Sequence, residues 1–357
     1  MRLNAVDLFS GAGGLLQGLL QTDYNVLFSV EIDKAAVRTH LENFPDIPVF
    51  DDDIRNLTKE KMVELTKNSE IDLVVGGPPC QGFSVFGKRR FINTQGYNPK
   101  EDDRNKLVYE FIRVVRELKP KYFFMENVKG FLSLDKGLFV EEVIKEFKSL
   151  GYDKIEYKVF CAADYGVPQK RYRMLMIGNR LGQDIIFPEP THSENPSLLS
   201  HPYKTVGQAI MDLVNFTETD IPNHVPLKHK DIVSERMAYV KEGSKLNIED
   251  LPEHLLQATR VDSKTGKVKN YSHIYKRLHR ELPSNTLVPG HNAFPIHPTL
   301  NRTLTVREAA RIQTFPDTHV FFGTRQQQCI QVGNAVPPLM AKPFFEQIKN
   351  SLSLEKE

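Results

Sequence analysis

The chain has 357 residues, of which 40% are hydrophobic and 26% charged, with a formal net charge of +2 at pH 7. A chain of this length can bury one sizeable core and a second small one, so we expect one or two domains. No run approaches the roughly 18 apolar residues of a membrane span and no signal-peptide pattern opens the chain, which predicts a cytoplasmic protein that makes no membrane contact.

The first half of the chain alternates short apolar runs with amphipathic segments. Strands are predicted at 5–9, 26–30, 71–75, 122–125, 158–160 and 174–177, and helices at 15–20, 35–44, 107–118 and about 139–150. Helices interleaved with buried strands are typical of an α/β fold with a doubly wound, mainly parallel sheet. We therefore predict a catalytic, cofactor-binding domain over residues 1–214.

Prolines interrupt the regular patterns after Pro188, which predicts a smaller, loop-rich domain over 215–300. Within it, the stretch 258–280 holds seven basic residues against the single acid Asp262. Such a stretch suits a phosphate backbone, although a solvated loop explains it equally well. Helical periodicity resumes at 305–314 and 339–348, so we expect the segment 301–357 to return to the first domain.

A glycine-rich run, Asp7-Leu8-Phe9-Ser10-Gly11-Ala12-Gly13-Gly14, lies between the first predicted strand and its helix. Glycines there let the backbone approach a ligand at a helix N-terminus, although a structural tight turn is the alternative. Glu31 closes the second strand, where an acid commonly holds ribose hydroxyls. Leu16 stands in place of the third glycine of the dinucleotide pattern, so the spacing favours S-adenosylmethionine over NAD.

Cys80 follows the strand 71–75 within the run Gly76-Gly77-Pro78-Pro79-Cys80-Gln81-Gly82-Phe83-Ser84. A lone cysteine is usually a small buried hydrophobe. Two prolines before it favour a nucleophile instead, because a nucleophile needs fixed aim and partial exposure. Cys161 and Cys329 lie far away in the sequence, so neither a disulfide framework nor a metal site is predicted.

Two further blocks carry polar groups toward the same edge of the predicted sheet. Glu126 is predicted to follow the strand 122–125, either as a helix cap or as an acid that hydrogen-bonds a heterocyclic nitrogen. Arg171 and Arg173 lie on one side of an extended segment by period two. They could serve a phosphate, a base carbonyl or a surface ion pair.

These blocks, in this order, resemble the cytosine-5 DNA methyltransferase family. Two C-terminal blocks also match: Arg302-Thr303-Leu304-Thr305-Val306-Arg307-Glu308 with Phe315-Pro316-Asp317, and Gln331-Val332-Gly333-Asn334-Ala335-Val336-Pro337-Pro338. The resemblance spans nearly the whole chain. It implies a Rossmann-like S-adenosylmethionine-dependent methyltransferase with a target-recognition domain, which methylates the 5-position of a cytosine flipped out of double-stranded DNA.

The resemblance also implies residue roles. Cys80 is expected to attack the base, Glu126 to engage it and Arg173 to hold its carbonyl, while Arg171 supports the site or a phosphate. The residues expected to line the cofactor site are Phe9, Gly11, Gly14, Glu31, Ile32, Asp53, Ile54, Pro78, Leu107, Asn334 and Ala335. Those expected to contact DNA are Gln81, Ser84 and Thr286, the last within the Thr286-Leu287 element of the recognition domain.

The segment from Val85 to Arg104 is longer than a minimal family member needs, and fits either a loop that closes over DNA or a solvated insertion. A transfer RNA cytosine-5 methyltransferase of the same fold is the nearest alternative function. The long stretch between Arg173 and Arg302 favours DNA. A non-catalytic DNA-binding protein of this fold is a second alternative, which the intact Cys80 argues against. The compact chain suggests a monomeric modification enzyme of a bacterial restriction system, paired in function with an endonuclease.

Overall fold

The computed structural model describes residues 2–79, 106–217, 219–256, 275–288 and 294–354. The chain divides into two compact units, each described by itself below. The first unit comprises Met1–Tyr165, Tyr172–Pro190 and Val336–Glu357, and the second comprises Gly166–Arg171 and Thr191–Ala335. No helix in these described ranges is long and apolar enough to cross a membrane.

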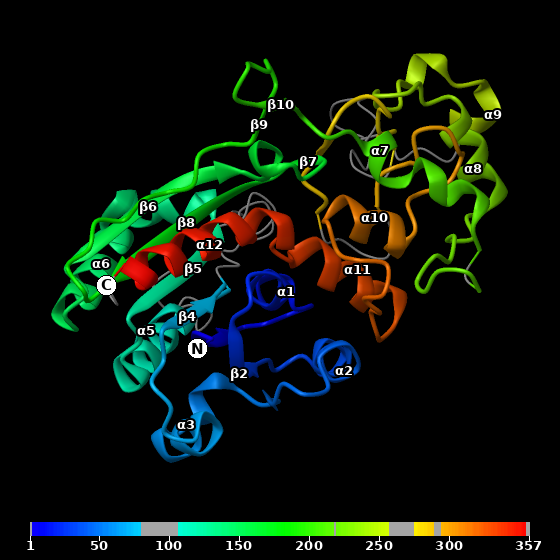
Figure 1. Cartoon of the computed structure of the whole chain (residues 1–357). Helices are drawn as coiled ribbons and strands as arrows, with labels where there is room; N and C mark the ends of the chain where they lie inside the picture. Colours follow the sequence, from blue (N-terminus) through cyan, green and yellow to red (C-terminus); the bar gives the residue numbers. More distant parts are fainter. Residues whose placement is uncertain (1, 80–105, 218, 257–274, 289–293, 355–357) are drawn as a thin grey trace. The chain divides into compact units, whose positions relative to one another are not determined.

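In the described part of the first unit, seven strands form one sheet in the order β3-β2-β1-β4-β5-β8-β6 (Figure 1). The strands are β1 (Asn4–Leu8), β2 (Asn25–Val30), β3 (Val49–Phe50), β4 (Leu73–Gly76), β5 (Tyr122–Val128), β6 (Lys154–Cys161) and β8 (Tyr172–Asn179). Neighbours from β3 to β5 pair in parallel, whereas β8 runs antiparallel to β5 and β6. The predicted doubly wound, mainly parallel sheet is confirmed.

The strand order reverses at β1, since β2 and β3 extend the sheet on one side and β4 and β5 on the other. Ligands of open α/β sheets bind outside the carboxyl ends of the strands at such a reversal. The loop after β1 is the glycine run, and the loop after β4 begins with Gly77-Pro78-Pro79. The topology therefore brings the two chemically informative loops to the edge where a ligand is expected.

Helices cover both faces of this sheet. On one face, α1 (Gly14–Gln21) packs against α12 (Pro338–Leu354) (Figure 1). The rings of Phe124 and Phe345 meet there with centroids 5.1 Å apart. On the other face, the main hydrophobic core joins Phe123 and Met125 to residues of α3 (Lys59–Thr66), α5 (Leu107–Leu118) and α6 (Leu138–Ser149). Because side chains alternate along a strand, Glu126 shares the α12 face with Phe124. Helix α2 (Lys34–Asn43) connects β2 to β3.

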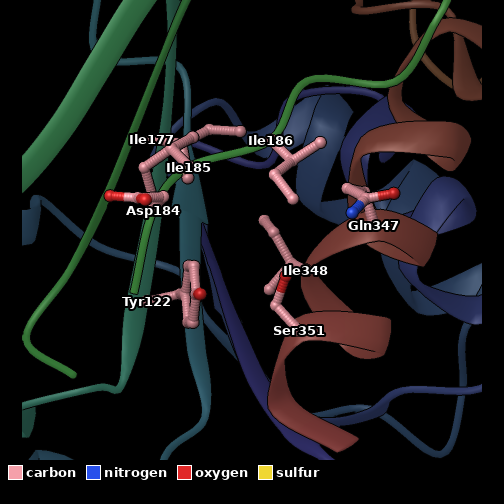
Figure 2. A pocket seen from close by; sticks show the side chains of 8 residues that line it. All are labelled: Tyr122, Ile177, Asp184, Ile185, Ile186, Gln347, Ile348 and Ser351. Carbon is pink, nitrogen blue, oxygen red and sulfur yellow. The ribbon is translucent and has the colours of Figure 1, made fainter. Parts of the chain in front are cut away.

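A small hollow lies where the C-terminal part of α12 meets the sheet (Figure 2). Tyr122 and Ile177 line it from the strands, and Ile348 and Ser351 line it from the helix. Tyr122 is the first residue of β5, so the hollow is at the opposite end of that strand from Glu126. It has room for about one water molecule, which makes it a packing gap and not a ligand site.

The second unit consists of short elements connected by long loops. Its strands pair in twos: β7 (Gln169–Lys170) with β11 (Ser284–Asn285), and β9 (His192–Ser193) with β10 (His201–Pro202). Its helices are α7 (Val206–Ile210), α8 (Asp231–Ala238), α9 (Glu253–Leu256), α10 (Val306–Ile312) and α11 (Arg325–Asn334). A small core gathers Met237, Val240, Leu246, Leu251, Leu255 and Ile296.

The two units divide the chain at other points than the predicted domains 1–214, 215–300 and 301–357. Residues 166–171 belong to the second unit because β7 pairs with β11. Residues up to Ala335 belong there as well, because the fully buried Arg307 of α10 donates to the carbonyl oxygens of Pro222 and His319. Which residues read DNA is a separate question, and the recognition role of 215–300 stays a prediction.

Two arginines of the basic stretch have structural partners. Arg277 is 5% exposed, and its guanidinium donates to the carbonyl oxygens of Met237, Val240, His297 and Leu300 and to the side chain of Asn301. Arg280 pairs with Glu242, with Nη2 2.9 Å from Oε2. The phosphate contact considered for this stretch is therefore wrong for Arg277, because burial leaves its guanidinium no access to DNA. Arg260, Lys264, Lys267 and Lys269 lie outside the described residues.

Candidate functional site

The loop after β1 is shaped by residues with left-handed backbone. Phe9, Gly11 and Gly13 have φ values of 58°, 54° and 79°. Such a value is uncommon for a phenylalanine and marks strain held by the surrounding structure. A Cβ added at Gly11 would meet no atom closer than 4.0 Å, so space is open beside this glycine.

Gly14 has a different reason to be glycine. A Cβ on this residue would lie 2.1 Å from the carbonyl oxygen of Val336, in the C-terminal segment of the same unit. Any side chain would push the two backbones apart, since real Cβ atoms do not approach backbone so closely. Gly14 thus fixes the start of α1 against the segment that follows Ala335. Its predicted place in a cofactor site stays a prediction.

Glu31 is held by three backbone N–H groups at the end of β2. Its Oε2 accepts from Gly11 at 2.6 Å, and its Oε1 accepts from Ile32 and Asp33 at 2.9 and 2.8 Å. Burial raises the pKa of Glu31, and these three N–H groups oppose the rise. The carboxylate keeps further lone pairs for donors such as ribose hydroxyls.

The side chain of Ile32, next to Glu31, is 58% exposed. An exposed isoleucine beside a carboxylate held in place provides an apolar surface for a flat ring and an acceptor for a sugar. The apolar surface of Ile32, the acceptor oxygens of Glu31 and the open space at Gly11 together fit an adenosine moiety.

Asp53 and its neighbours lie in the loop that follows β3. Asp53 caps the short 3₁₀ helix Ile54–Asn56 and pairs with Arg55, with Nη2 2.6 Å from Oδ2; this arginine lowers the pKa of Asp53. The side chain of Ile54 is buried in the main core, and Leu107, the first residue of α5, packs against that core. The carbonyl oxygen of Ile54 accepts from Nη2 of Arg113 at 2.7 Å and from the N–H of Leu57 at 3.1 Å, so neither its side chain nor its carbonyl group is open to a ligand.

Asp7, the fourth residue of β1, is completely buried, and neither of its carboxyl oxygens has a hydrogen-bond partner among the described residues. Burial raises the pKa of Asp7 from 3.8 to about 8; the nearby Ser10 lowers it and Glu31 raises it further. Ser29 is opposite Asp7 on β2, and its buried hydroxyl likewise lacks a partner in the described structure. An unsatisfied carboxyl at the reversal of the sheet is typical of a functional site.

The loop after β4 is tied to the end of β5. Asn127 donates from its side-chain amide to the carbonyl oxygen of the buried Pro78 at 3.1 Å. A Cβ on Gly77 would lie 2.9 Å from Oε2 of Glu126, so glycine at this position leaves room for that carboxylate. These contacts place the Gly77-Pro78-Pro79 segment directly beside Glu126.

Glu126 lies inside β5. The sequence had predicted that it follows the end of this strand. The difference arises because β8 pairs with the last residues of β5, with Glu126 opposite Leu175 and Val128 opposite Arg173. This register sets Arg173 diagonally across from Glu126, and Nε of Arg173 is 2.6 Å from Oε1 of Glu126. Both side chains are nearly buried, 13% and 12% exposed, and burial lowers the pKa of Arg173 while Glu126 opposes that shift.

The two described cysteines are poor nucleophiles. Cys161 and Cys329 are buried, and burial raises the pKa of both thiols, that of Cys329 to about 11. A thiol with a raised pKa forms little thiolate near neutral pH. Cys80 lies outside the described residues, as do Gln81, Ser84 and the segment from Val85 to Arg104.

In the second unit, Arg171 supports the end of α11. Its side chain is fully buried, and its guanidinium donates to the carbonyl oxygens of Gly333 and Asn334 at 2.9 and 3.0 Å. A cation at the carboxyl end of a helix is favourable because the terminal carbonyl groups carry partial negative charge. This geometry favours the supporting role of Arg171 over a phosphate contact.

A chain of buried amides runs from Thr286-Leu287 to the end of α11. The N–H of Leu287 donates to Oε1 of Gln169, whose Nε2 donates to Oε1 of Gln313, both at 3.1 Å. Nε2 of Gln313 then donates to the carbonyl oxygen of Val332 at 2.7 Å. Both glutamines are fully buried. We call Gln169 and Gln313 the glutamine pair.

Sequence reasoning missed the glutamine pair, the Asn127 contact and the buried Asp7 carboxyl. Asp7 opens the glycine-rich run, Asn127 is next to Glu126, and Gln169 precedes Arg171 by two residues. Their proximity to those residues was a signal, but their partners are distant in the chain and only the fold reveals them. Within the first unit the structure joins Gly11 to Glu31, and Glu126 to Arg173 and Gly77. Within the second it joins Thr286 to β7, and Arg171 to Asn334.

The family model "C-5 cytosine-specific DNA methylase" matches residues 3–350 of the chain. The chain is 40% identical to the Type II methyltransferase M1.HphI of Haemophilus parahaemolyticus, over 98% of this chain and 87% of that protein. It is 35% identical to the Type II methyltransferase M.XorII of Xanthomonas oryzae pv. oryzae, over 99% of this chain and 86% of that protein.

Solved structures share the fold along the whole chain. A putative DNA modification methyltransferase encoded within an E. coli prophage superposes with a TM-score of 0.72 at 28% identity, covering 98% of this chain and 99% of the other. The DNMT2 of Spodoptera frugiperda superposes with a TM-score of 0.59 at 18% identity, covering 97% and 99%, and at that identity it supports the fold alone.

Proposed function

Because the chain belongs to the family of C-5 cytosine-specific DNA methylases, we propose that Cys80, Glu126 and Arg173 perform its methyl transfer at the carboxyl edge of β4 and β5. The chain is a DNA (cytosine-5-)-methyltransferase. The observation that carries the residue assignment is the Glu126–Arg173 ion pair, with Gly77 packed against the Glu126 carboxylate. Cys80 follows Gly77 by only three residues in the sequence.

Carbon 5 of cytosine is a weak nucleophile, so the ring needs activation before methylation. Addition of the Cys80 thiolate sulfur to carbon 6 breaks the double bond between carbons 5 and 6 and moves its electron pair to carbon 5. After methylation, loss of the proton on carbon 5 returns an electron pair to the ring, and Cys80 leaves as the thiolate. The stacked base must be flipped out of the duplex for this attack.

Glu126 and Arg173 are suited to bind the polar edge of that base. Nitrogen 3 of the cytosine ring, between the carbonyl carbon and the carbon that carries the amino group, accepts a hydrogen bond, so a proton carried by Glu126 would complete the contact and favour addition at carbon 6. The guanidinium of Arg173 is a fixed donor for the adjacent carbonyl oxygen. In the ligand-free geometry these two groups neutralise each other, and an incoming base replaces part of that pairing.

S-adenosylmethionine, when bound, supplies the methyl group on a positively charged sulfur. The residues of the first unit that suit it are Glu31 for the ribose hydroxyls, Ile32 for the adenine ring and the backbone at Phe9 and Gly11 for close approach. Asp53, Ile54 and Pro78, which follow β3 and β4, and Leu107 at the start of α5 would complete the site. Asn334 and Ala335, which Arg171 and Gln313 support, are proposed to join it from the end of α11.

Double-stranded DNA is the proposed partner, contacted by Gln81, Ser84 and Thr286. The relatives with 30–40% identity are named Type II methyltransferases, so transfer RNA is the less favoured substrate. We further propose that the chain acts as a monomer in the cytoplasm of a bacterium, and modifies the sites of a partner restriction endonuclease.

Two measurements test this proposal. Bisulfite sequencing of DNA from cells that express the chain should reveal 5-methylcytosine within one short word. Duplex DNA with 5-fluorocytosine at that position should form a lasting covalent complex with the wild type, because the fluorine on carbon 5 cannot leave as a proton does and Cys80 is not released. Cys80→Ser should form no complex, because it lacks the attacking thiolate. Cys161→Ser is the matched control and should still form the complex. If Cys80→Ser forms it equally well, Cys80 is not the nucleophile.

A further inference from the structure

Two adjacent leucines of the second unit project fully into solvent. Leu198 and Leu199 have relative exposures of 106% and 93%, and the next most exposed large hydrophobic side chain among the described residues is Ile186 at 60%. A single exposed apolar side chain needs no explanation, but two neighbouring leucines in a loop leave about their whole surface in water. Neighbouring apolar side chains that are exposed in this way often mark a contact site for another molecule.

The leucines are held outward by an ordered turn. Ser197 and Ser200 close it: the N–H of Ser200 donates to the carbonyl oxygen of Ser197 at 3.3 Å, and the N–H of Ser197 donates to Oγ of Ser200 at 3.0 Å. Oγ of Ser197 also accepts from the N–H of Leu199 at 3.2 Å. Leu198 and Leu199 are thus the two corner residues of a serine-closed turn, where glycine or polar residues are usual. We call residues 197–200 the leucine turn.

The base of the leucine turn connects to the segment that carries Thr286. The pairing of β9 with β10 closes the loop below the turn. Lys170 of β7 reaches this loop, with Nζ 2.8 Å from Oε1 of Glu194 and 5.6 Å from the ring centre of Tyr203. The carbonyl oxygen of the same Lys170 accepts from Oγ1 of Thr286 at 3.2 Å. One residue therefore links the base of the loop to Thr286.

The charge around this base suits a polyanion. Basic side chains gather there, because the ring centroids of His192 and His201 lie 5.5 Å apart and Lys204 follows β10 by two residues. Glu194, which pairs with Lys170, is 69% exposed and makes a surface ion pair that salt screens. A phosphate backbone would meet basic groups at the base of the loop and the two leucines at its tip.

We propose that the leucine turn is a DNA-contacting element, in which Leu198 and Leu199 pack against base or sugar edges beside the segment contacted through Thr286. Apolar side chains that insert between or against base steps unstack them and widen access to the duplex. This role rests on the proposed DNA contact of the second unit, and it adds an apolar wedge to an enzyme that must extract one base. A protein partner or a second copy of the chain is the competing occupant.

The test compares Leu198→Ala/Leu199→Ala with Ile186→Ala, which removes an exposed apolar side chain from the first unit near the hollow shown in Figure 2. Dissociation constants are measured for duplex DNA that holds the methylated word, across a range of salt concentrations. The double variant should bind about tenfold or more weakly, because two leucines lose an apolar contact. The salt dependence should keep its slope, because no phosphate contact is lost. Ile186→Ala should match the wild type, and all three proteins should melt alike.

Fluorescence of 2-aminopurine at the target position gives a second readout, which should show less base extrusion in the double variant. Equal DNA affinity and extrusion in the double variant and the wild type would overturn the proposal. So would unchanged DNA binding together with a loss of self-association in sedimentation velocity, which would assign the leucines to a protein contact. Failure of the wild type itself to methylate DNA would instead contradict the proposed function.

Discussion

Arg173 holds the carboxylate of Glu126 through a 2.6 Å contact between Nε and Oε1, and both side chains are almost excluded from water. The contact exists because β8 runs antiparallel to β5 and places Arg173 opposite Val128, two residue pairs from Glu126 and on the same face of the sheet. Two opposite charges buried in this way are costly unless they pair with each other or with a ligand. In the proposed mechanism, the pair exchanges part of this internal contact for the polar edge of a base.

Glu126→Gln should lower the single-turnover rate by about 10²- to 10⁴-fold, the usual range for a positioned acid or base. The amide keeps the shape of the side chain but cannot transfer a proton. Cofactor affinity, measured by calorimetry, should stay close to that of the wild type. Glu110→Gln is the matched control, since Glu110 also pairs with an arginine, Arg113, at 2.7 Å and lies in α5. A rate near the wild-type value for Glu126→Gln would assign this residue a structural role.

Arg171→Met should destabilise the protein, although the unbranched methionine side chain can occupy the space of the apolar part of the arginine. The change leaves the carbonyl oxygens of Gly333 and Asn334 without their donor, and each buried unsatisfied group costs about 1–3 kcal/mol. Thermal melting measures the loss. Arg55→Met, which removes a half-exposed arginine paired with Asp53, should shift the melting temperature far less. An unchanged melting temperature for Arg171→Met would remove Arg171 from its supporting role.

The amino-acid pattern predicted the sheet of the first unit well because buried strands and amphipathic helices leave a periodic signal. The helix at 107–118 has the predicted bounds, and the strand predicted at 26–30 is one residue longer in the structure. Helix α11 was not predicted, because its sequence from Arg325 to Asn334 is rich in glutamine and has no apolar stripe. Its start was nonetheless readable, since Thr324 and Gln327 form a capping box.

Contacts between residues distant in the chain were beyond sequence reasoning. The two-residue pairing of β7 with β11 has no periodicity to detect, yet it decides that residues 166–171 join the second unit. Arg277 looked like part of a basic surface, but five backbone and side-chain oxygens surround its guanidinium. Residue type identified the chemistry of Glu126 and Arg173, whereas only the register of β5 and β8 joins them.

The contribution of Asp7 to the stability of the cofactor-free protein should fall as pH rises between about 4 and 8. Burial raises the pKa of Asp7 from 3.8 to about 8 in the folded state, so the folded protein binds a proton there that the unfolded chain has released. The Asp7 contribution is therefore fully present below pH 3.8 and is lost as pH approaches 8, at up to about 1.4 kcal/mol per pH unit.

Asp7→Asn isolates this contribution, because asparagine has the same shape and does not titrate. The free energy of unfolding is measured with denaturant at several pH values. The value for the variant minus the value for the wild type should increase as pH rises through this window. Above pH 8 the difference should level off. A difference that is constant from pH 4 to 8 would show that Asp7 binds no proton in the folded state.

Gln313→Met should weaken cofactor binding and its response to DNA together. The glutamine pair connects Leu287 to Val332 through a continuous chain of hydrogen bonds. Leu287 is next to the proposed DNA contact Thr286, and Val332 is two residues before the proposed cofactor contact Asn334. Methionine keeps the volume of glutamine but makes none of these bonds. We therefore expect the affinity for S-adenosylhomocysteine, measured by calorimetry, to rise on addition of target DNA in the wild type and to rise several-fold less in Gln313→Met.

Gln331→Met is the matched control for this prediction. Gln331 is also a buried glutamine of the second unit, and it donates to the carbonyl oxygen of Phe322 at 2.8 Å, outside the glutamine pair. Its replacement should lower the melting temperature by a similar amount, because each variant loses buried hydrogen bonds. It should leave the ratio of cofactor affinities with and without DNA unchanged. If both variants reduce that ratio equally, the loss reflects general destabilisation of the unit, and the glutamine pair has no special part in coupling the two ligands.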